Sequence, residues 1–278
     1  MSKDVSLMQQ TARRMSGFLG RESTVVRTLR PAYEEFLDWS YQRRGIPWSI
    51  NGEAYRIDPR QRHRLAENYD ASVAEFLRER VPPGAVCFDV GANVGVYVLQ
   101  FARWSGETGH VVAFEPNPSA VTVLRKHVAM NDLMEQVTIV PMAVGRSGGE
   151  AKFYACGADG MSRLGEANRL IADRAVEMRV PVITLDEFCA GEGLRPDWLF
   201  IDIEGFEIGA LEGARNLIER SGAALNIVVE MHPSVWDSAG TTRSCAEDLL
   251  ASLELRAVPL TGQTNPLGEY GIVWLERR

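Results

Sequence analysis

From about residue 80 onward, short runs of β-branched and other apolar residues alternate with segments of helical periodicity. The apolar runs cover residues 85–90, 110–116, 137–144, 197–203, 224–231, 255–260 and 271–276. Between the first two runs, Val94, Val98 and Phe101 recur at the spacing of a helix that packs against a sheet. This alternation predicts an α/β fold in which helices cover both faces of a mainly parallel sheet.

Further β segments are predicted outside the parallel part of this sheet. Residues 150–156 and 177–185 indicate a β insertion at the sheet edge, too widely separated in sequence for a tight hairpin. Residues 255–260 and 271–276 flank a Gly/Pro/Asn-rich segment and predict a closing antiparallel pair.

Residues 1–70 differ in character from the rest. They contain amphipathic helical patterns around Val25 and Phe36, followed by a turn signal at Asn51-Gly52. We expect a mainly helical cap or oligomerisation arm over 1–70, hence a homo-oligomer formed through this segment. Residues 71–278 would then form the main domain.

Composition narrows the functional classes. The chain has 278 residues, 45% of them hydrophobic, and no uninterrupted apolar run approaches the roughly 20 residues of a membrane span. The polar N-terminus does not resemble a signal peptide, and the four scattered cysteines favour reduced thiols, so we expect a cytoplasmic protein without a membrane partner. A net charge of -7 argues against a nucleic-acid partner.

The first strand leads into the run Asp89-Val90-Gly91-Ala92-Asn93-Val94-Gly95. Glycines allow a tight turn and close approach to a ligand, and the following helix presents free N–H groups, which suggests a nucleotide-like ligand. The spacing is not the GxGxxG dinucleotide fingerprint, and a carboxylate at Asp89 would repel a pyrophosphate. A cationic cofactor suits this loop better.

Glu115 ends the second strand, 20 residues after Gly95. A carboxylate in this place can accept hydrogen bonds from both hydroxyls of a ribose. Considered singly, Glu115 is equally explained as an ordinary carboxylate of a strand–helix turn. Together, Asp89 and Glu115 predict a site for S-adenosylmethionine.

The segments FDVGANVGVYV, VVAFEPNP, VTIVPMAVG, VPVITLDEF and FIDIEGFEIGALEGA resemble the FkbM family of S-adenosylmethionine-dependent methyltransferases. The resemblance covers residues from about 70 to 276. It implies a class I methyltransferase sheet of the Rossmann-like type, in the order 3-2-1-4-5-7-6 with the last strand antiparallel. It also implies methyl transfer to a hydroxyl, commonly of a sugar or a polyketide.

The resemblance also implies roles for individual residues. The cofactor would be bound by residues at its methionine end, at its ribose and near its adenine: Asp89, Gly91, Asn93, Gly95, Glu115, Asn117, Met142 and Ala143, with Asp202 beside them. The sequence departs from the family at Phe200, where a lysine often precedes the Ile-Asp pair, so any role of that lysine is missing or supplied elsewhere.

The acceptor side is expected at the ends of the fourth and fifth strands. Asp202 and Glu204 follow the fourth strand, while Glu230 and His232 lie at the end of the fifth, facing the crevice where open α/β sheets bind ligands. We predict His232, Asp202 and Glu204 as catalytic residues, with His232 as general base. His232 before Pro233 is almost equally explained as a loop residue.

The same side chains suggest an alternative chemistry. Asp202, Glu230 and His232 could bind Mg²⁺, which would lower the pKa of a coordinated hydroxyl. Two neighbours are given structural roles: Glu207 is expected to complement the N-terminus of its helix, and Trp236 to fill core.

The sequence thus predicts an S-adenosylmethionine-dependent O-methyltransferase. Its acceptor would be a small molecule or saccharide: a sugar, an oligosaccharide or a glycosylated natural product. The alternatives are an N-methyltransferase of a small molecule or protein, a noncatalytic cofactor-binding protein and a nucleotide-dependent oxidoreductase. The absence of an Asn-Pro-Pro-Tyr-like motif after the fourth strand weakens amino-group and nucleobase methylation.

Overall fold

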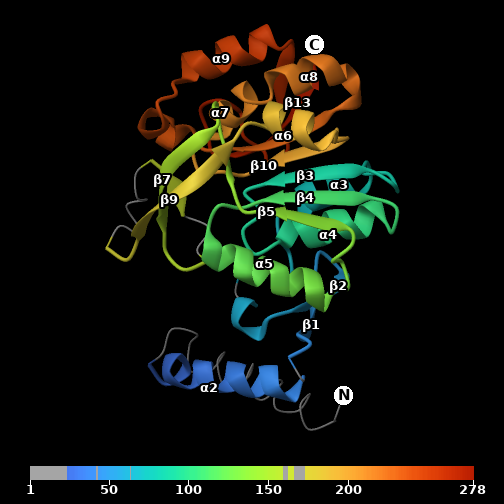
Figure 1. Cartoon of the computed structure of the whole chain (residues 1–278), viewed down its shortest axis with the longest axis vertical. Coiled ribbons are helices and arrows are strands. Elements are labelled where there is room, and N and C mark those ends of the chain that lie inside the picture. The colour runs from blue at the N-terminus through green and yellow to red at the C-terminus, as the bar shows by residue number, and fades with distance from the viewer. Residues whose placement is uncertain (1–23, 42, 63, 159–161, 166–172) are drawn as a thin grey trace. The chain divides into compact units, whose positions relative to one another are not determined.

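A computed structural model describes residues 24–41, 43–62, 64–158, 162–165 and 173–278 (Figure 1). The chain divides into two compact units, residues 1–69 and 70–278. Residues 1–23, which form part of the expected N-terminal arm, lie outside the described residues.

The first unit contains a helix and a β-hairpin. Helix α2 spans Thr24–Ser40, strands β1 and β2 span Ile46–Ile50 and Glu53–Ile57, and the short helix η1 spans Pro59–Gln61. Asn51 and Gly52 both have positive φ, 50° and 83°, which suits a two-residue hairpin turn. The described part of this unit therefore contains a strand pair in addition to the expected helix.

The second unit is built on a seven-stranded sheet with the order β12-β13-β11-β10-β3-β4-β5. Numbered along this sheet, that is the expected order 3-2-1-4-5-7-6. The strands are β3 (Val86–Val90), β4 (His110–Phe114), β5 (Val137–Val140), β10 (Trp198–Ile201), β11 (Asn226–Met231), β12 (Leu255–Pro259) and β13 (Gly271–Arg277). Strand β13 runs antiparallel to both of its neighbours, and the other pairs are parallel.

Helices connect these strands and shield the apolar sheet from water. They are α3 (Ala71–Arg78), α4 (Val96–Ser105), α5 (Pro118–Met130), α6 (Leu185–Glu192), α7 (Glu207–Glu212), α8 (Arg215–Ser221) and α9 (Arg243–Ser252), with the short helices η2 (Gly222–Ala224) and η3 (Pro233–Ala239). The buried rings of Phe88, Phe114 and Phe188 pack edge to face at 4.9–5.7 Å in the core. Such packing fixes strands β3 and β4 against helix α6, and the loop of the Asp89–Gly95 run follows β3.

The insertion forms a sheet of its own, with the order β6-β9-β7-β8. Its strands are β6 (Ala143–Val144), β7 (Gly149–Ala155), β8 (Arg163–Leu164) and β9 (Val176–Ile183). The expected single strand over 137–144 is wrong, because β5 ends at Val140 and β6 belongs to this second sheet. Pro141 follows β5 directly; it has no N–H for a strand ladder and restricts the residue before it.

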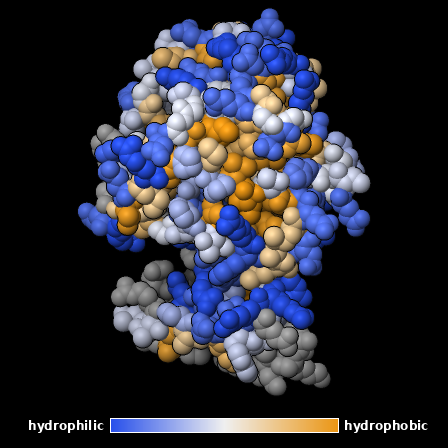
Figure 2. Space-filling model, in the orientation of Figure 1, coloured by the Kyte–Doolittle hydropathy of each residue, from blue (hydrophilic) through white to orange (hydrophobic). Residues whose placement is uncertain are grey.

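The surface is mixed. Figure 2 shows hydrophilic residues over most of the visible face, with apolar residues gathered where β3, β4 and β5 lie. Among the described residues, no helix combines the length and apolar character needed to cross a lipid bilayer.

Candidate active site

Four acidic residues lie at the carboxyl ends of four adjacent strands. Asp89 is in β3, Glu115 follows β4, Asp202 follows β10 and Glu230 is in β11. The strand register aligns their ends: Ile201 pairs with Val90, and Val90 pairs with Phe114. The sheet therefore brings together residues that are up to 141 positions apart at the edge where the sequence predicted a ligand site.

The loop after β3 requires glycine where it crosses β10. Gly91 has φ +92°, and a Cβ atom built on it would lie 1.8 Å from the backbone oxygen of Asp202. The Asp202 N–H donates to the Val90 carbonyl at 2.8 Å, which holds the two segments together. No side chain fits between them, so the backbone itself forms the floor of the site.

Glu115 is held in place by the loop that it faces. Its carboxylate accepts backbone N–H bonds from Asn93 and Asn117, both at 2.8 Å, and only 6% of the residue is exposed. Burial raises the pKa of Glu115 to about 7, although both hydrogen bonds favour the charged form.

Asp89 is buried still more deeply, with 2% of its surface exposed. Burial and the negative charge of Glu115 raise the pKa of Asp89 to about 8. Within the described part of the chain, Asp89 Oδ2 and Asn93 Oδ1 are buried without a hydrogen-bond partner. Buried acceptors without donors are costly, so this cradle fits a ligand that brings a positive charge and N–H or O–H donors.

The other predicted cofactor residues have structural partners. Gly95 precedes helix α4 with φ +94°, and a Cβ there would lie 2.5 Å from Leu124 Cδ1. The Asn117 side chain caps helix α5 and donates to the Gly157 carbonyl at 2.7 Å, which ties the insertion to the turn between β4 and α5. Met142 is partly buried against the main core, whereas Ala143 lies in the core of the insertion sheet. Their place near adenine stays a prediction.

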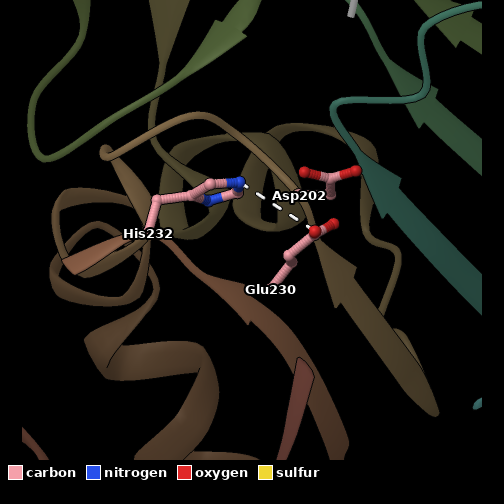
Figure 3. Close-up of side chains that lie close together, drawn as sticks. All are labelled: Asp202, Glu230 and His232. Carbon is pink, nitrogen blue, oxygen red and sulfur yellow. Dashed lines mark ion pairs between the residues drawn. The ribbon is translucent and has the colours of Figure 1, made fainter. Parts of the chain in front are cut away.

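The predicted acceptor residues lie together. Asp202, Glu230 and His232 each offer one ligand atom, and these atoms lie within 4.8 Å of one another (Figure 3). His232 Nε2 is 4.0 Å from Glu230 Oε1. Burial, together with the negative charge of Glu230 and a hydrogen bond to it, raises the pKa of Asp202 well above its ordinary value. Carboxyl groups in this position favour sharing a proton or binding a cation.

Glu207 is more than the helix-terminal charge expected from the sequence. It is fully buried, and its carboxylate accepts hydrogen bonds from His232 Nδ1 at 2.5 Å, Trp236 Nε1 at 2.9 Å and the Gly205 N–H at 2.8 Å. A carboxylate accepting from Nδ1 fixes the proton there and leaves the Nε2 lone pair facing Glu230. The sequence offered no signal for this bond, because it joins the first residue of α7 to the residue before η3, 25 positions further along the chain.

The charges around His232 set its acid–base behaviour. Burial by itself lowers the pKa of His232, but the Glu207 hydrogen bond and the negative charges of Glu207, Glu230 and Glu204 outweigh it, so the pKa is raised. Glu204 is partly exposed and acts on His232 through its charge, outside the three-residue cluster. Its catalytic role stays a prediction.

Two aromatic residues, Phe200 in β10 and Tyr270 just before β13, have contacts that bear on the site. Phe200, where the family often has lysine, is buried against the rings of Tyr97 at 4.0 Å and Phe101 at 6.3 Å. Tyr270, which the sequence did not single out, has its ring 5.3 Å from that of His232 and donates its hydroxyl proton to Glu230. Continuing the β11–β13 register past Met231–Gly271 places Tyr270 opposite His232.

The chain is similar in sequence or in fold to several known methyltransferases. The chain is 26% identical over 188 residues to the hexuronic acid methyltransferase AglP of Haloferax volcanii, covering 66% of this chain and 70% of that protein. It is 27% identical over 187 residues to methyltransferase sdnD of Sordaria araneosa, covering 58% and 70%. The crystal structure of methyltransferase FkbM from Methylobacillus flagellatus KT matches with a TM-score of 0.46 and 14% identity, covering 77% and 56%.

The family assignment rests on the sequence match itself. Residues 89–251, more than half of the chain, match the family described as "Methyltransferase FkbM domain". This range begins at Asp89 and includes Glu115, Asp202 and His232. The chain therefore belongs to the FkbM methyltransferase family.

Proposed function

We propose that this methyltransferase uses S-adenosylmethionine to methylate a hydroxyl of a sugar, an oligosaccharide or a glycosylated natural product. One observation carries the proposal: a buried cradle for a cationic ligand and a histidine whose Nδ1 is bonded to Glu207 and whose Nε2 faces Glu230 lie at the same sheet edge. The likeness to a protein named for hexuronic acid methylation supports a sugar as acceptor.

The cradle fits the cofactor through the chemistry of its donor set. Asp89 and Asn93 offer buried acceptors for an ammonium group, and Glu115 can accept from ribose hydroxyls while keeping its two backbone hydrogen bonds. S-adenosylmethionine, when bound, supplies an electrophilic methyl group on a sulfonium. The acidic cradle favours such a cation over a pyrophosphate.

His232 would act as general base for the acceptor hydroxyl. Its Nε2 accepts the proton, and Glu207, bonded to Nδ1, stabilises the imidazolium that results. Glu204 and Glu230 add negative charge that favours the same protonated form. Asp202, beside the cofactor loop, would hold the acceptor by hydrogen bonding.

A divalent cation such as Mg²⁺ is the alternative occupant of this cluster. The carboxylates of Asp202 and Glu230 suit Mg²⁺, whereas the imidazole of His232 is a ligand more typical of transition metals such as Zn²⁺. Because Nδ1 is bonded to Glu207, Nε2 can serve as base or as metal ligand, but not as both at once. A metal would replace the base by lowering the pKa of a coordinated hydroxyl.

The test is methyl transfer from radiolabelled S-adenosylmethionine to a panel of saccharides, hydroxylated glycosides and amines, with Mg²⁺ and with EDTA. We expect label in a sugar. Transfer that withstands EDTA supports His232 as base, whereas transfer and a Mg²⁺-induced rise in Tm that are both lost in Asp202→Asn support the metal. Label in amines alone, or in no acceptor despite cofactor binding, contradicts the proposal.

Variants separate the two halves of the site. We expect Glu115→Ala to abolish cofactor affinity, measured by calorimetry, because the buried carboxylate has no substitute. His232→Ala should retain that affinity and lower kcat by roughly 10²–10⁴-fold, the range for loss of a general base. Glu207→Gln should reduce kcat and shift its pH profile. Equal loss of cofactor binding in all three variants would contradict this division.

A further inference from the structure

Tyr270 is an exposed aromatic residue beside an otherwise buried cluster. Among the aromatic side chains described between residues 70 and 278, only Tyr270 is largely exposed, with 67% of its surface accessible. Trp236, the other aromatic residue near His232, is 2% exposed and bonded to Glu207. Tyr270 is therefore the largely exposed aromatic surface beside His232.

The ring is fixed in place despite its exposure. The Tyr270 hydroxyl donates to Glu230, and the next residue, Gly271, leaves no room for a Cβ, which would lie 2.4 Å from Gln263 Nε2. Gln263 is itself buried and donates to the Ile272 carbonyl at 3.1 Å. Holding an exposed apolar ring in one orientation costs conformational entropy and gains little burial, so it indicates a surface shaped for a ligand.

Asp70, whose charge interacts with that of Glu230, has an unusual backbone conformation. It precedes helix α3 with φ +43° and does not cap that helix with its side chain. Instead, its carboxylate accepts a hydrogen bond from the Tyr97 hydroxyl at 3.3 Å, and its charge acts on Tyr270. A left-handed conformation at a residue other than glycine is strained, and such strain is concentrated at functional positions.

We propose that Tyr270 and Asp70 form the acceptor subsite and that its ligand is an uncharged pyranose. The C–H face of the sugar would lie on the Tyr270 ring, and a hydroxyl would donate to Asp70. This inference rests on the proposed function and narrows its substrate class. The ring has an apolar face, and a carboxylate has only acceptor atoms, which suits a ligand with C–H faces and O–H edges.

The carboxylates around this subsite disfavour an acidic sugar. The charges that act on Asp70, Asp202 and Tyr270 all come from carboxylates, Glu230 being common to the three. A uronate bound on Tyr270 would bring a further negative charge to this cluster, and like charges in a partly desolvated site disfavour binding. A divalent cation at Asp202 and Glu230 would offset part of the repulsion, so the comparison is made with and without EDTA.

The experiment measures sugar binding separately from turnover. Saturation-transfer NMR with S-adenosylhomocysteine present would compare methyl glucoside, galactoside and mannoside with the matching uronides, using Tyr270→Phe, Tyr270→Leu and Asp70→Asn. Tyr270→Leu should weaken binding of the neutral glycoside by roughly five- to tenfold, as loss of an aromatic contact does, and Tyr270→Phe by much less. Asp70→Asn should narrow the preference for neutral sugars over uronides.

Controls decide between folding and binding effects. Met134→Ala removes another exposed side chain, before the start of β5 and so away from the carboxyl ends of the strands, and should leave sugar binding unchanged. Each variant should keep the wild-type Tm and cofactor Kd. Wild-type sugar binding in Tyr270→Leu, equal binding of uronide and neutral glycoside, or no saturation of any sugar would each overturn the subsite. Sugar binding without methyl transfer would keep the subsite and contradict the proposed function.

Discussion

Two buried acids set the chemistry of the cofactor cradle. Asp89 and Glu115 are nearly inaccessible, and burial is the main reason that their pKa values rise to about 8 and about 7. Without a cationic ligand, the ionised forms are poorly stabilised, because Asp89 Oδ2 has no donor among the described residues. Affinity for a cation is therefore built into the folded state at a cost to its stability.

Because Asp89 and Glu115 are buried, the free energy of unfolding should depend on pH. Because both pKa values are higher in the folded than in the unfolded chain, the folded state binds more protons, and stability falls as pH rises from about 4 to about 8. We expect Asp89→Asn to flatten this slope and to stabilise the cofactor-free protein at pH 8 by a few kcal/mol. Urea unfolding at pH 5 and pH 8 measures it. Glu150→Gln, at an exposed acid, should keep the wild-type slope.

At the scale of elements, the glycine loop and strand β10 depend on each other. The loop after β3 passes so close to Asp202 that a single methyl group at Gly91 would overlap its carbonyl oxygen. The same crossing orders Asp202 for the acceptor side. One close backbone approach therefore links the glycine loop to the cluster of Asp202, Glu230 and His232.

Alanine substitutions at two glycines compare the effect of a steric clash with that of backbone strain alone. Gly91 and Gly193 both have positive φ, but a Cβ at Gly193 would meet nothing within 4 Å. Gly193→Ala should lose about 1 kcal/mol of unfolding free energy, the cost of a left-handed conformation. Gly91→Ala should lose several times as much, or bind cofactor at least tenfold more weakly, because β10 must move. Similar unfolding free energies and cofactor affinities in the two variants would contradict the role of the crossing.

At the scale of the whole molecule, the chain is divided into two compact units, and the predicted site residues all belong to the second. Each predicted cofactor, catalytic and metal residue lies within residues 70–278. The first unit has its own internal ties, such as the ion pairs of Arg60 with Glu35 and of Arg62 with Glu34. The oligomerisation role of residues 1–70 stays a prediction.

A truncated chain tests this division. We expect residues 66–278 to bind S-adenosylhomocysteine with the affinity of the full chain, because the cradle residues all lie in the second unit. Calorimetry measures the affinity, and light scattering compares the two masses. A full-length oligomer beside a monomeric fragment would support the arm, whereas loss of cofactor binding in a folded fragment would show that the units are interdependent.

The sequence by itself determined the sheet and the family, and it predicted which residues bind the cofactor. Strand–helix periodicity, the Asp89–Gly95 loop and Glu115 are local signals, because each depends on residues close together in the chain. Pro141 is a local signal that β5 and β6 are separate strands. The apolar pattern continues on both sides of this proline, however, and for that reason it predicted one strand. Local patterns reach as far as a single strand–loop–helix unit.

Only the tertiary structure decided how the acceptor half is arranged. The Glu207–His232 bond and the Tyr270–Glu230 bond join residues 25 and 40 positions apart through the packing of α7 and the pairing of β11 with β13. Periodicity shows which face of an element is buried, not which distant side chain it meets. Burial, the close approach at Gly91 and the resulting pKa shifts exist only once the sheet has assembled, because each depends on atoms from several strands.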